Sequence, residues 1–148
     1  MTPVFTFDLE KFDFTAVHEW LASTYWSPGI SPEKVEKGFR ASTLCIGAFD
    51  GGRQVGMARC VSDTTRFAYL ADVYVDITAR KQGLAKEMVR RLMEHPLVAD
   101  VDAWYLRTLD AHAVYAALDY EPIQNPESFM VRRRPAVPSA APLRGSGG

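Results

Sequence analysis

The nine residues Phe67–Val75 place the strongest constraint on the fold of this chain. Their sequence, FAYLADVYV, is apolar at neighbouring as well as alternate positions except for Asp72, and such a strand belongs inside a sheet with both faces covered. A polar turn over 76–83 follows, and residues 83–95 carry apolar side chains at helical spacing. Since residues 101–107 have the pattern of another strand, we predict a parallel strand–helix–strand crossover.

The residues around this unit predict an antiparallel meander and short helices. Asp50-Gly51-Gly52 is a turn between two apolar stretches, and Ser31-Pro32 places an N-cap residue before a proline at a helix start. The further elements expected are strands at 4–9, 44–49, 54–61 and 129–132, and helices at 14–21, 32–39 and 111–118. Together these patterns predict an α/β or α+β domain.

The composition is that of one globular domain. Of 148 residues, 47% are hydrophobic and 24% are charged, which excludes a disordered chain, a collagen-like repeat and a coiled coil. A net charge of −1 argues against a protein that coats nucleic acid, and no apolar run approaches the roughly 20 residues that span a bilayer, so we expect neither nucleic-acid nor membrane partners. We predict a single domain over 1–134 and a flexible tail over 135–148, which offers few apolar anchors.

The two cysteines indicate neither a disulfide framework nor a metal site. Cys45 and Cys60 lie in apolar, strand-like stretches, and a zinc site would need closer ligand spacing with histidines nearby. We therefore expect core thiols, a reducing cytoplasmic location and no metal ion.

Residues 80–85 have the composition of a phosphate-binding turn. The amides at a helix start lack backbone partners, and the helix dipole adds positive potential there. Gly83 and Ala85 leave room for a phosphate to approach those amides, and Arg80 and Lys81 add mobile positive charge. A basic helix start with an ordinary glycine is the alternative. Because the chain contains neither GxxxxGK[ST] nor GxGxxG, it does not predict a Walker or a Rossmann site.

The run Arg80-Lys81-Gln82-Gly83-Leu84-Ala85 resembles the Q/R-x-x-G-x-G/A signature of the GNAT family of N-acetyltransferases. Val73-Tyr74-Val75 is similar to that family's fourth strand, and VYAALDY over 114–120 resembles its Y-x-x-x-G-[FY] segment. The order of the elements is also similar, and the resemblance covers roughly residues 3–133. It implies a mixed, mostly antiparallel twisted sheet flanked by helices, with one parallel strand–helix–strand crossover.

The resemblance also implies an activity. A protein of this family is an acyl-CoA-dependent N-acyltransferase, which moves the acetyl group of acetyl-CoA to a primary amine by direct attack in a ternary complex. The family pattern assigns the pyrophosphate of acetyl-CoA to the backbone amides of residues 80–85, and the pantetheine to Val73 and Val75. It identifies Tyr115 as the residue that donates a proton to the departing CoA thiolate. The alternative is that Tyr115 is only a core aromatic residue on a short helix.

Three positions depart from the family pattern. Lys81 stands where many relatives have glycine, so we expect ordinary backbone angles there. Asp119 replaces the glycine before the last tyrosine of the motif, and aspartate tolerates the left-handed region that a glycine there would supply. The family often has an asparagine after the fifth strand that touches the cofactor, and Thr108 and His112 are the candidates for that contact here.

An acceptor amine attacks a carbonyl only in its neutral form, so a side chain or a water chain must take its proton. Asp72 is the first candidate, as a base or as a contact for the acceptor's ammonium, and a structural pairing with an arginine is the alternative. His112 is the second, with a solvent-facing residue as the alternative. The acceptor, a small-molecule amine or a peptide amine, is expected beside Tyr25 and Trp26, where packing of a helix end on the sheet is the alternative.

Two other classes of function stay open. A non-catalytic CoA-binding or regulatory module would keep the fold, but the presence of Tyr115 and Gly83 favours an enzyme. An acetyltransferase that modifies proteins would need an open acidic groove, which the acidic excess before residue 128 permits. The residues identify neither the acceptor nor the oligomeric state, although homodimers formed through edge strands are common in the family.

Overall fold

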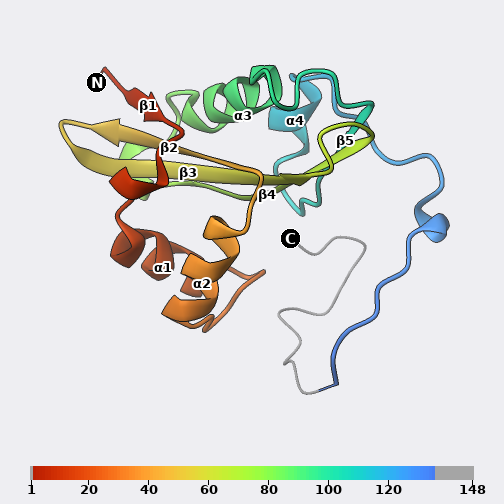
Figure 1. Ribbon diagram of the computed structural model, residues 1–148, viewed down its shortest axis with the longest axis horizontal. Helices are drawn as coiled ribbons and strands as arrows, with labels where there is room; N and C mark the ends of the chain where they lie inside the picture. The colour runs from red at the N-terminus through yellow and green to blue at the C-terminus, as the bar shows by residue number, and fades with distance from the viewer. Residues whose placement is uncertain (1, 136–148) are drawn as a thin grey trace.

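The structure, a computed structural model, describes residues 2–135 (Figure 1). Its strands and helices are, in chain order, β1 (Val4–Thr6), α1 (Phe14–Ala22), α2 (Pro32–Arg40), β2 (Leu44–Asp50), β3 (Arg53–Ser62), β4 (Phe67–Val75), α3 (Leu84–Glu94), β5 (Ala103–Tyr105) and α4 (His112–Ala116). The sheet formed by the described residues has the order β1-β2-β3-β4-β5, with antiparallel neighbours except for the parallel pair β4–β5. This confirms the predicted mixed, mostly antiparallel sheet with one parallel crossover.

Helices cover both faces of this sheet. α1 and α2 lie on one face, and α3 and α4 lie on the other (Figure 1). Phe39 of α2 packs with Met57 of β3 in one apolar cluster, whereas Met88 of α3 packs with Ile46 of β2 in another. The apolar pattern of Phe67–Val75 is explained by this arrangement, because β4 lies between two helical layers.

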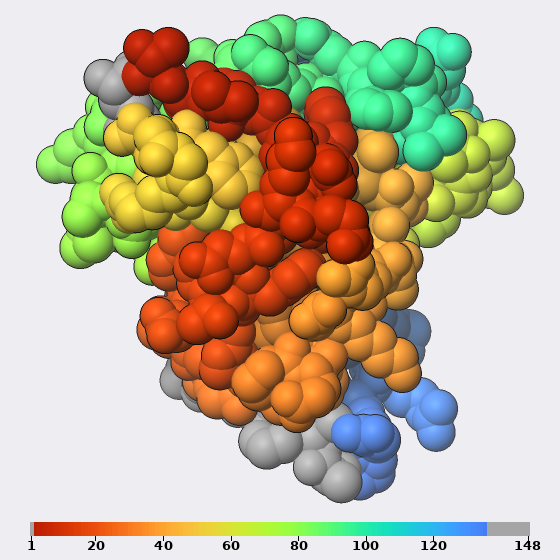
Figure 2. Space-filling view, turned by 60° about the vertical axis from the view of Figure 1, so that its left-hand side comes forward, coloured from red at the N-terminus to blue at the C-terminus, as the bar shows by residue number. Residues whose placement is uncertain are grey.

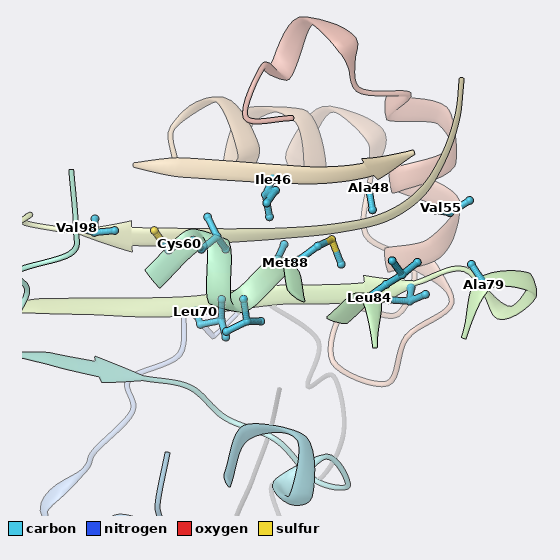
Figure 3. Close-up of a cluster of buried hydrophobic side chains, with 13 residues drawn as sticks. Ile46, Ala48, Val55, Cys60, Leu70, Ala79, Leu84, Met88 and Val98 are labelled. Carbon is cyan, nitrogen blue, oxygen red and sulfur yellow. The ribbon is translucent and has the colours of Figure 1, made fainter. Parts of the chain in front are cut away.

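The cluster beneath α3 is the larger of the two (Figure 3). Met88, Val89 and Leu92 of α3 are fully buried in it. The helix lies so close to β3 that a Cβ on Gly56 would stand 3.0 Å from the Cε of Met88. Burial of a side chain of this size contributes about 1.5–3 kcal/mol to the free energy of unfolding. The packing of these side chains therefore fixes the position of α3, including its start, relative to the sheet.

The N-terminal strand closes one edge of the sheet. β1 pairs with β2, and the rings of Phe7 and His95 meet edge to face with centroids 4.9 Å apart. The guanidinium of Arg91 lies 4.3 Å from the centroid of the Phe5 ring. In Figure 2 this red segment lies between the green α3 layer and the orange α1 and α2 layer. The β1 edge is therefore tied to α3.

β4 and β5 run together for only three residues. Residues 67–69 pair with Ala103–Tyr105, and no later pair joins these strands in the part of the chain that the structure describes. The register between β3 and β4 shifts between Met57 and Arg59, and Asp72 in the displaced part of β4 has a φ of 55°. A bulge of this kind bends a strand and turns its side chains. The second half of β4 is therefore left without a partner on its β5 side.

One predicted strand is wrong, and several boundaries differ. Residues 129–132 form no strand: Met130 is 96% exposed, and the backbone of this segment pairs with none of the described strands. β1 is shorter than predicted because the Asp8 side chain accepts a hydrogen bond from the amide of Glu10 and starts a 3-10 turn there. β5 and α4 are also shorter than predicted. The predicted tail lies outside the described residues from 136 onward.

The cysteines are core residues, as predicted. Cys45 and Cys60 are buried and free, and burial raises the pKa of their thiols to about 12 and about 11. Among residues 2–135, no three His, Cys, Asp or Glu side chains lie close enough together to hold a metal ion. None of the described helices is both long enough and apolar enough to cross a membrane.

Candidate functional site

Two adjoining cavities open beside the unpaired edge of β4. The larger is a cleft of about 640 Å³ between the end of β4, the start of α3 and the segment after α1. The smaller cavity, of about 100 Å³, lies between β4 and the segment after β5. Tyr25, Trp26, Val73 and Asp110 line both, so the cavities meet at these four residues.

The turn before α3 presents backbone amides to the cleft. Gly83 has a φ of 76° and Lys81 a φ of 65°, and turns that include left-handed residues form concave sites in which successive N–H groups bind anions. Within the described part of the chain, no side chain caps the start of α3. The first-turn amides of Leu84 and Ala85 have no intrahelical acceptor, and both residues line the cleft, so these amides are available to an anionic ligand.

Lys81 does not keep ordinary backbone angles, and the prediction that it does so is wrong. Its φ of 65° is left-handed, a conformation that costs a non-glycine residue about 1–2 kcal/mol. With this angle, the chain changes direction between Arg80 and the start of α3. Lys81 and a second lysine, Lys86, both line the cleft. Asp119 also adopts the left-handed region, with a φ of 70°, as the sequence predicts.

Arg80 is anchored, so the prediction of mobile charge at this residue is wrong. Its Nε donates a hydrogen bond of 2.9 Å to the carbonyl oxygen of Val75, and its guanidinium lies 5.2 Å from the centroid of the Tyr74 ring. Arg80 therefore ties the turn to the end of β4 while it lines the cleft. Gln82 is exposed and lines neither cavity.

Val73 and Val75 lie on the part of β4 that β5 leaves unpaired. Val75 lines the cleft, and Val73 lines both cavities. β3 occupies the opposite edge of β4, where Gly56 pairs with Val75. The backbone groups that β3 does not use can therefore bond an extended ligand, as an added strand would.

Tyr115 enters the smaller cavity from α4. Its ring packs against the core beneath α3 and meets the Tyr120 ring edge to face, with centroids 5.8 Å apart. Burial, together with smaller contributions from the nearby Tyr25 and Asp110, raises the pKa of the Tyr115 phenol to about 12. The phenol is therefore protonated at neutral pH and can donate a hydrogen bond to a group in this cavity.

Asp72 joins β4 to two other parts of the chain. Its Oδ1 accepts a hydrogen bond of 3.0 Å from the indole Nε1 of Trp26, and its Oδ2 accepts one of 2.7 Å from the Nε of Arg59. The guanidinium of Arg59 also donates to the hydroxyl of Ser42, at 3.2 Å. Asp72 thus makes the arginine pairing that the sequence leaves as its alternative role. It lines the smaller cavity, but a proton on its carboxylate would weaken the ion pair with Arg59.

Tyr25 and Trp26 form the wall between the cavities. Their rings meet edge to face with centroids 5.0 Å apart. Trp26 is held to β4 through Asp72, and the hydroxyl of Tyr25 accepts a hydrogen bond of 3.3 Å from the amide of Leu109. The segment after α1 is therefore fastened both to β4 and to the segment after β5, across the gap between the diverging strands.

The segment after β5 agrees only in part with the prediction. Thr108 lines the smaller cavity, but its hydroxyl accepts a hydrogen bond of 3.0 Å from the amide of Ala111 and so caps the turn before α4. His112 is exposed and lines neither cavity. The sequence assigns no role to Asp110, Arg107 or Arg59, because no local pattern shows which residues the diverging strands bring together.

Comparisons with known proteins agree with this geometry. A profile described as the acetyltransferase (GNAT) family matches residues 7–120. A structure from Xanthomonas campestris that is assigned to the GNAT acetyltransferases is 34% identical, with a TM-score of 0.86, and the match covers 93% of this chain and 96% of that one. A predicted acetyltransferase from Clostridium acetobutylicum, solved with acetyl-CoA, is 13% identical with a TM-score of 0.69 over 89% of this chain and 95% of that one, which shows a likeness in fold alone. No curated protein matches the chain.

Proposed function

Because this chain belongs to the acetyltransferase (GNAT) family, we propose that it transfers the acetyl group of acetyl-CoA to a primary amine by direct attack in a ternary complex. The observation that carries the proposal is the junction of the two cavities. The cleft has an uncapped helix start at one end and meets, at Val73 and Trp26, a small cavity that contains Tyr115. A cofactor in the cleft and an acceptor in the small cavity would therefore meet at this junction.

The pyrophosphate of acetyl-CoA is assigned to the start of α3. The free amides of Leu84 and Ala85 and the positive end of the helix dipole suit a negatively charged group. Lys81 and Lys86 line the same cleft and add charge that neutralises the phosphates. The C. acetobutylicum protein, which has a similar fold and was solved with acetyl-CoA, supports acetyl-CoA as the cofactor.

The pantetheine arm is assigned to the free edge of β4. Its amide groups can bond the backbone near Val73 and Val75 in place of the strand partner that β5 does not supply. An arm that runs along this edge from the start of α3 reaches Val73, which lines both cavities. The thioester would then lie between Trp26 and Tyr115.

Acetyl transfer at this position requires two proton movements. The neutral amine attacks the thioester carbonyl, a nitrogen–carbon bond forms and the carbon–sulfur bond breaks. Tyr115 donates its phenolic hydrogen bond, and then its proton, to the departing thiolate, and solvent replaces that proton. Since burial raises the pKa of Tyr115 to about 12, well above that of an ordinary thiol near 8.5, much of its effect comes from the hydrogen bond in the transition state.

The proton that the amine loses needs a separate acceptor. We assign it to Asp110, which lines both cavities and is exposed, so it can pass the proton on to solvent. Asp72 remains a candidate for contact with the ammonium form, but both of its oxygens already accept hydrogen bonds. Its larger contribution is to hold Trp26 at the junction.

A turnover assay tests this proposal. Release of free CoA thiol from acetyl-CoA is followed with a panel of small amines and peptides, and the acetylated product is measured by mass spectrometry. The proposal predicts CoA release that depends on an amine and equals the product formed. Binding of acetyl-CoA without turnover of any amine would instead support a non-catalytic CoA-binding module.

A further inference from the structure

Arg107 is exposed and follows the end of β5, on the wall of the small cavity. Successive side chains of a strand alternate between faces, and Trp104 and Leu106 pack into the cluster beneath α3. Tyr105 therefore points to the opposite face, where Tyr69 is its register partner. Burial raises the pKa of Tyr69, and the positive charge of Arg107 is the largest of the effects that lower it.

The guanidinium of Arg107 has no carboxylate partner within the described chain. Five other arginines, Arg40, Arg53, Arg59, Arg90 and Arg91, each form an ion pair. Arg107 lines the small cavity but forms neither a hydrogen bond nor an ion pair with residues 2–135. A positive charge at the wall of a small cavity favours an anionic group in the molecule that fills the cavity.

The carboxylates of the same cavity do not cancel this charge. Asp72 is engaged by Arg59 and Trp26. Asp110 lines the cavity but lies outside ion-pair distance of Arg107, so the two charges form separate sites. One site suits an ammonium group or its proton, and the other suits an anion.

From these two separate sites, one for an amine and one for an anion, we infer that the acceptor is a small aminocarboxylate. Its carboxylate binds Arg107 while its amine faces the thioester. The inference rests on the proposed acetyl transfer and names its acceptor class. Arginine binds carboxylates through two parallel hydrogen bonds, which fixes the orientation of the bound molecule. The cavity of about 100 Å³, with Leu70, Leu106 and Trp26 in its walls, admits a short apolar spacer between the two groups.

Matched pairs of amines test the inference. The acetylation of 3-aminopropanoate is compared with that of propylamine, and the acetylation of 4-aminobutanoate with that of butylamine. The loss of a charge-assisted, two-point contact weakens binding by about tenfold to a hundredfold, so kcat/KM should favour the carboxylate in each pair by that factor. The difference should lie mainly in KM, because Arg107 contacts the acceptor equally before and during the reaction.

Two charge reversals sharpen the test. Arg107→Glu should abolish the preference for the carboxylate and improve turnover of 1,3-diaminopropane. Arg66→Glu makes the same charge change at an exposed arginine that lines neither cavity, and it should keep the wild-type preference. Equal kcat/KM within each pair, or a preference that survives Arg107→Glu, would overturn the inference while leaving acetyl transfer intact.

A binding measurement separates this inference from the proposed function. If no amine is acetylated, the proposed function fails, and the acceptor site is then tested through intrinsic tryptophan fluorescence of the protein saturated with CoA. Saturable quenching by 3-aminopropanoate, weaker for propylamine and lost in Arg107→Glu, would support the carboxylate site. The absence of saturable quenching would overturn it.

Discussion

Replacement of Asp72 by asparagine should separate a structural role of this residue from a catalytic one. The change keeps the size of the side chain, and asparagine accepts a φ of 55° as readily as aspartate, so backbone strain does not change. It removes the charge that faces Arg59 at 2.7 Å. The side chains of Arg59 and Asp72 are 24% and 12% exposed, which places the pair between a surface ion pair, worth up to about 1 kcal/mol, and a buried one, whose breaking costs about 3–5 kcal/mol.

We therefore expect Asp72→Asn to lower the free energy of unfolding by about 2 kcal/mol. In a chain of this size that corresponds to a fall in Tm of about 6 °C, measured by calorimetry. A double-mutant cycle with Arg59→Gln should give a coupling energy of about 1–2 kcal/mol, because the two side chains share one ion pair.

The activity of the same variants identifies the role. If Asp72 positions Trp26, Asp72→Asn should lower kcat/KM for the acceptor about tenfold, and the pH at which kcat rises should not move. Trp26→Phe, which removes the indole donor, should have a similar effect. A Tm equal to that of the wild type, together with a loss of about 10²–10⁴ in kcat, would exclude a positioning role and make Asp72 the general base.

The remaining predictions concern the proton donor and the C-terminal residues. Tyr115→Phe keeps the ring and should lower kcat by about 10²–10⁴ with the Kd of acetyl-CoA unchanged, and turnover within about twofold of the wild type would rule out the hydroxyl as the donor. Burial raises the pKa of Tyr115 to about 12, so the phenol keeps its proton at all pH values up to about 10. As the pH increases toward about 10, kcat should therefore rise, because the amine loses its proton, and it should show no decline in this range. A descending limb at pH 8–9 would point to a different acid. Truncation after Arg134 should leave Tm and turnover nearly unchanged, since the removed residues offer few apolar anchors, and a drop of several degrees would show that they dock.

The parts of the fold that the sequence predicts are those with a local physical cause. Phe67–Val75 is a strand over the predicted residues because its apolar side chains need cover on both faces. Gly83 marks the start of α3 because the turn requires a left-handed residue there. The strand predicted at 129–132 fails because a strand also needs a neighbour, and the pattern of one segment does not show whether a neighbour exists.

The parts of the site that the sequence misses depend on distant contacts. Trp26 and Asp72 are 46 residues apart, and Arg59 reaches Asp72 from the neighbouring strand, so no spacing within one element shows their hydrogen bonds. The bulge that turns Asp72 arises from the register of two strands. Asp110 lines both cavities only because β5 diverges from β4.

Calorimetric titration of acetyl-CoA into Gly83→Val measures whether the start of α3 binds acetyl-CoA. Gly83 has a φ of 76° and lines the cleft, and no atom of residues 2–135 lies within 4 Å of the place where a Cβ would stand, so the valine would occupy the space that the pyrophosphate needs. Gly52→Val is the matched control: Gly52 has a φ of 83° and equally open surroundings but lies in the β2–β3 turn, outside both cavities. Both variants should therefore lose similar stability through backbone strain.

We expect one acetyl-CoA site per chain in the wild type and in Gly52→Val, and a Kd weaker by about a hundredfold or more in Gly83→Val. The wild type should also gain about 2.7 kcal/mol of stability at acetyl-CoA concentrations a hundred times the Kd, and Gly83→Val should gain almost none at the same concentration. Equal affinity in the two variants, or no measurable binding to the wild type, would contradict the claim that the start of α3 holds the pyrophosphate of acetyl-CoA.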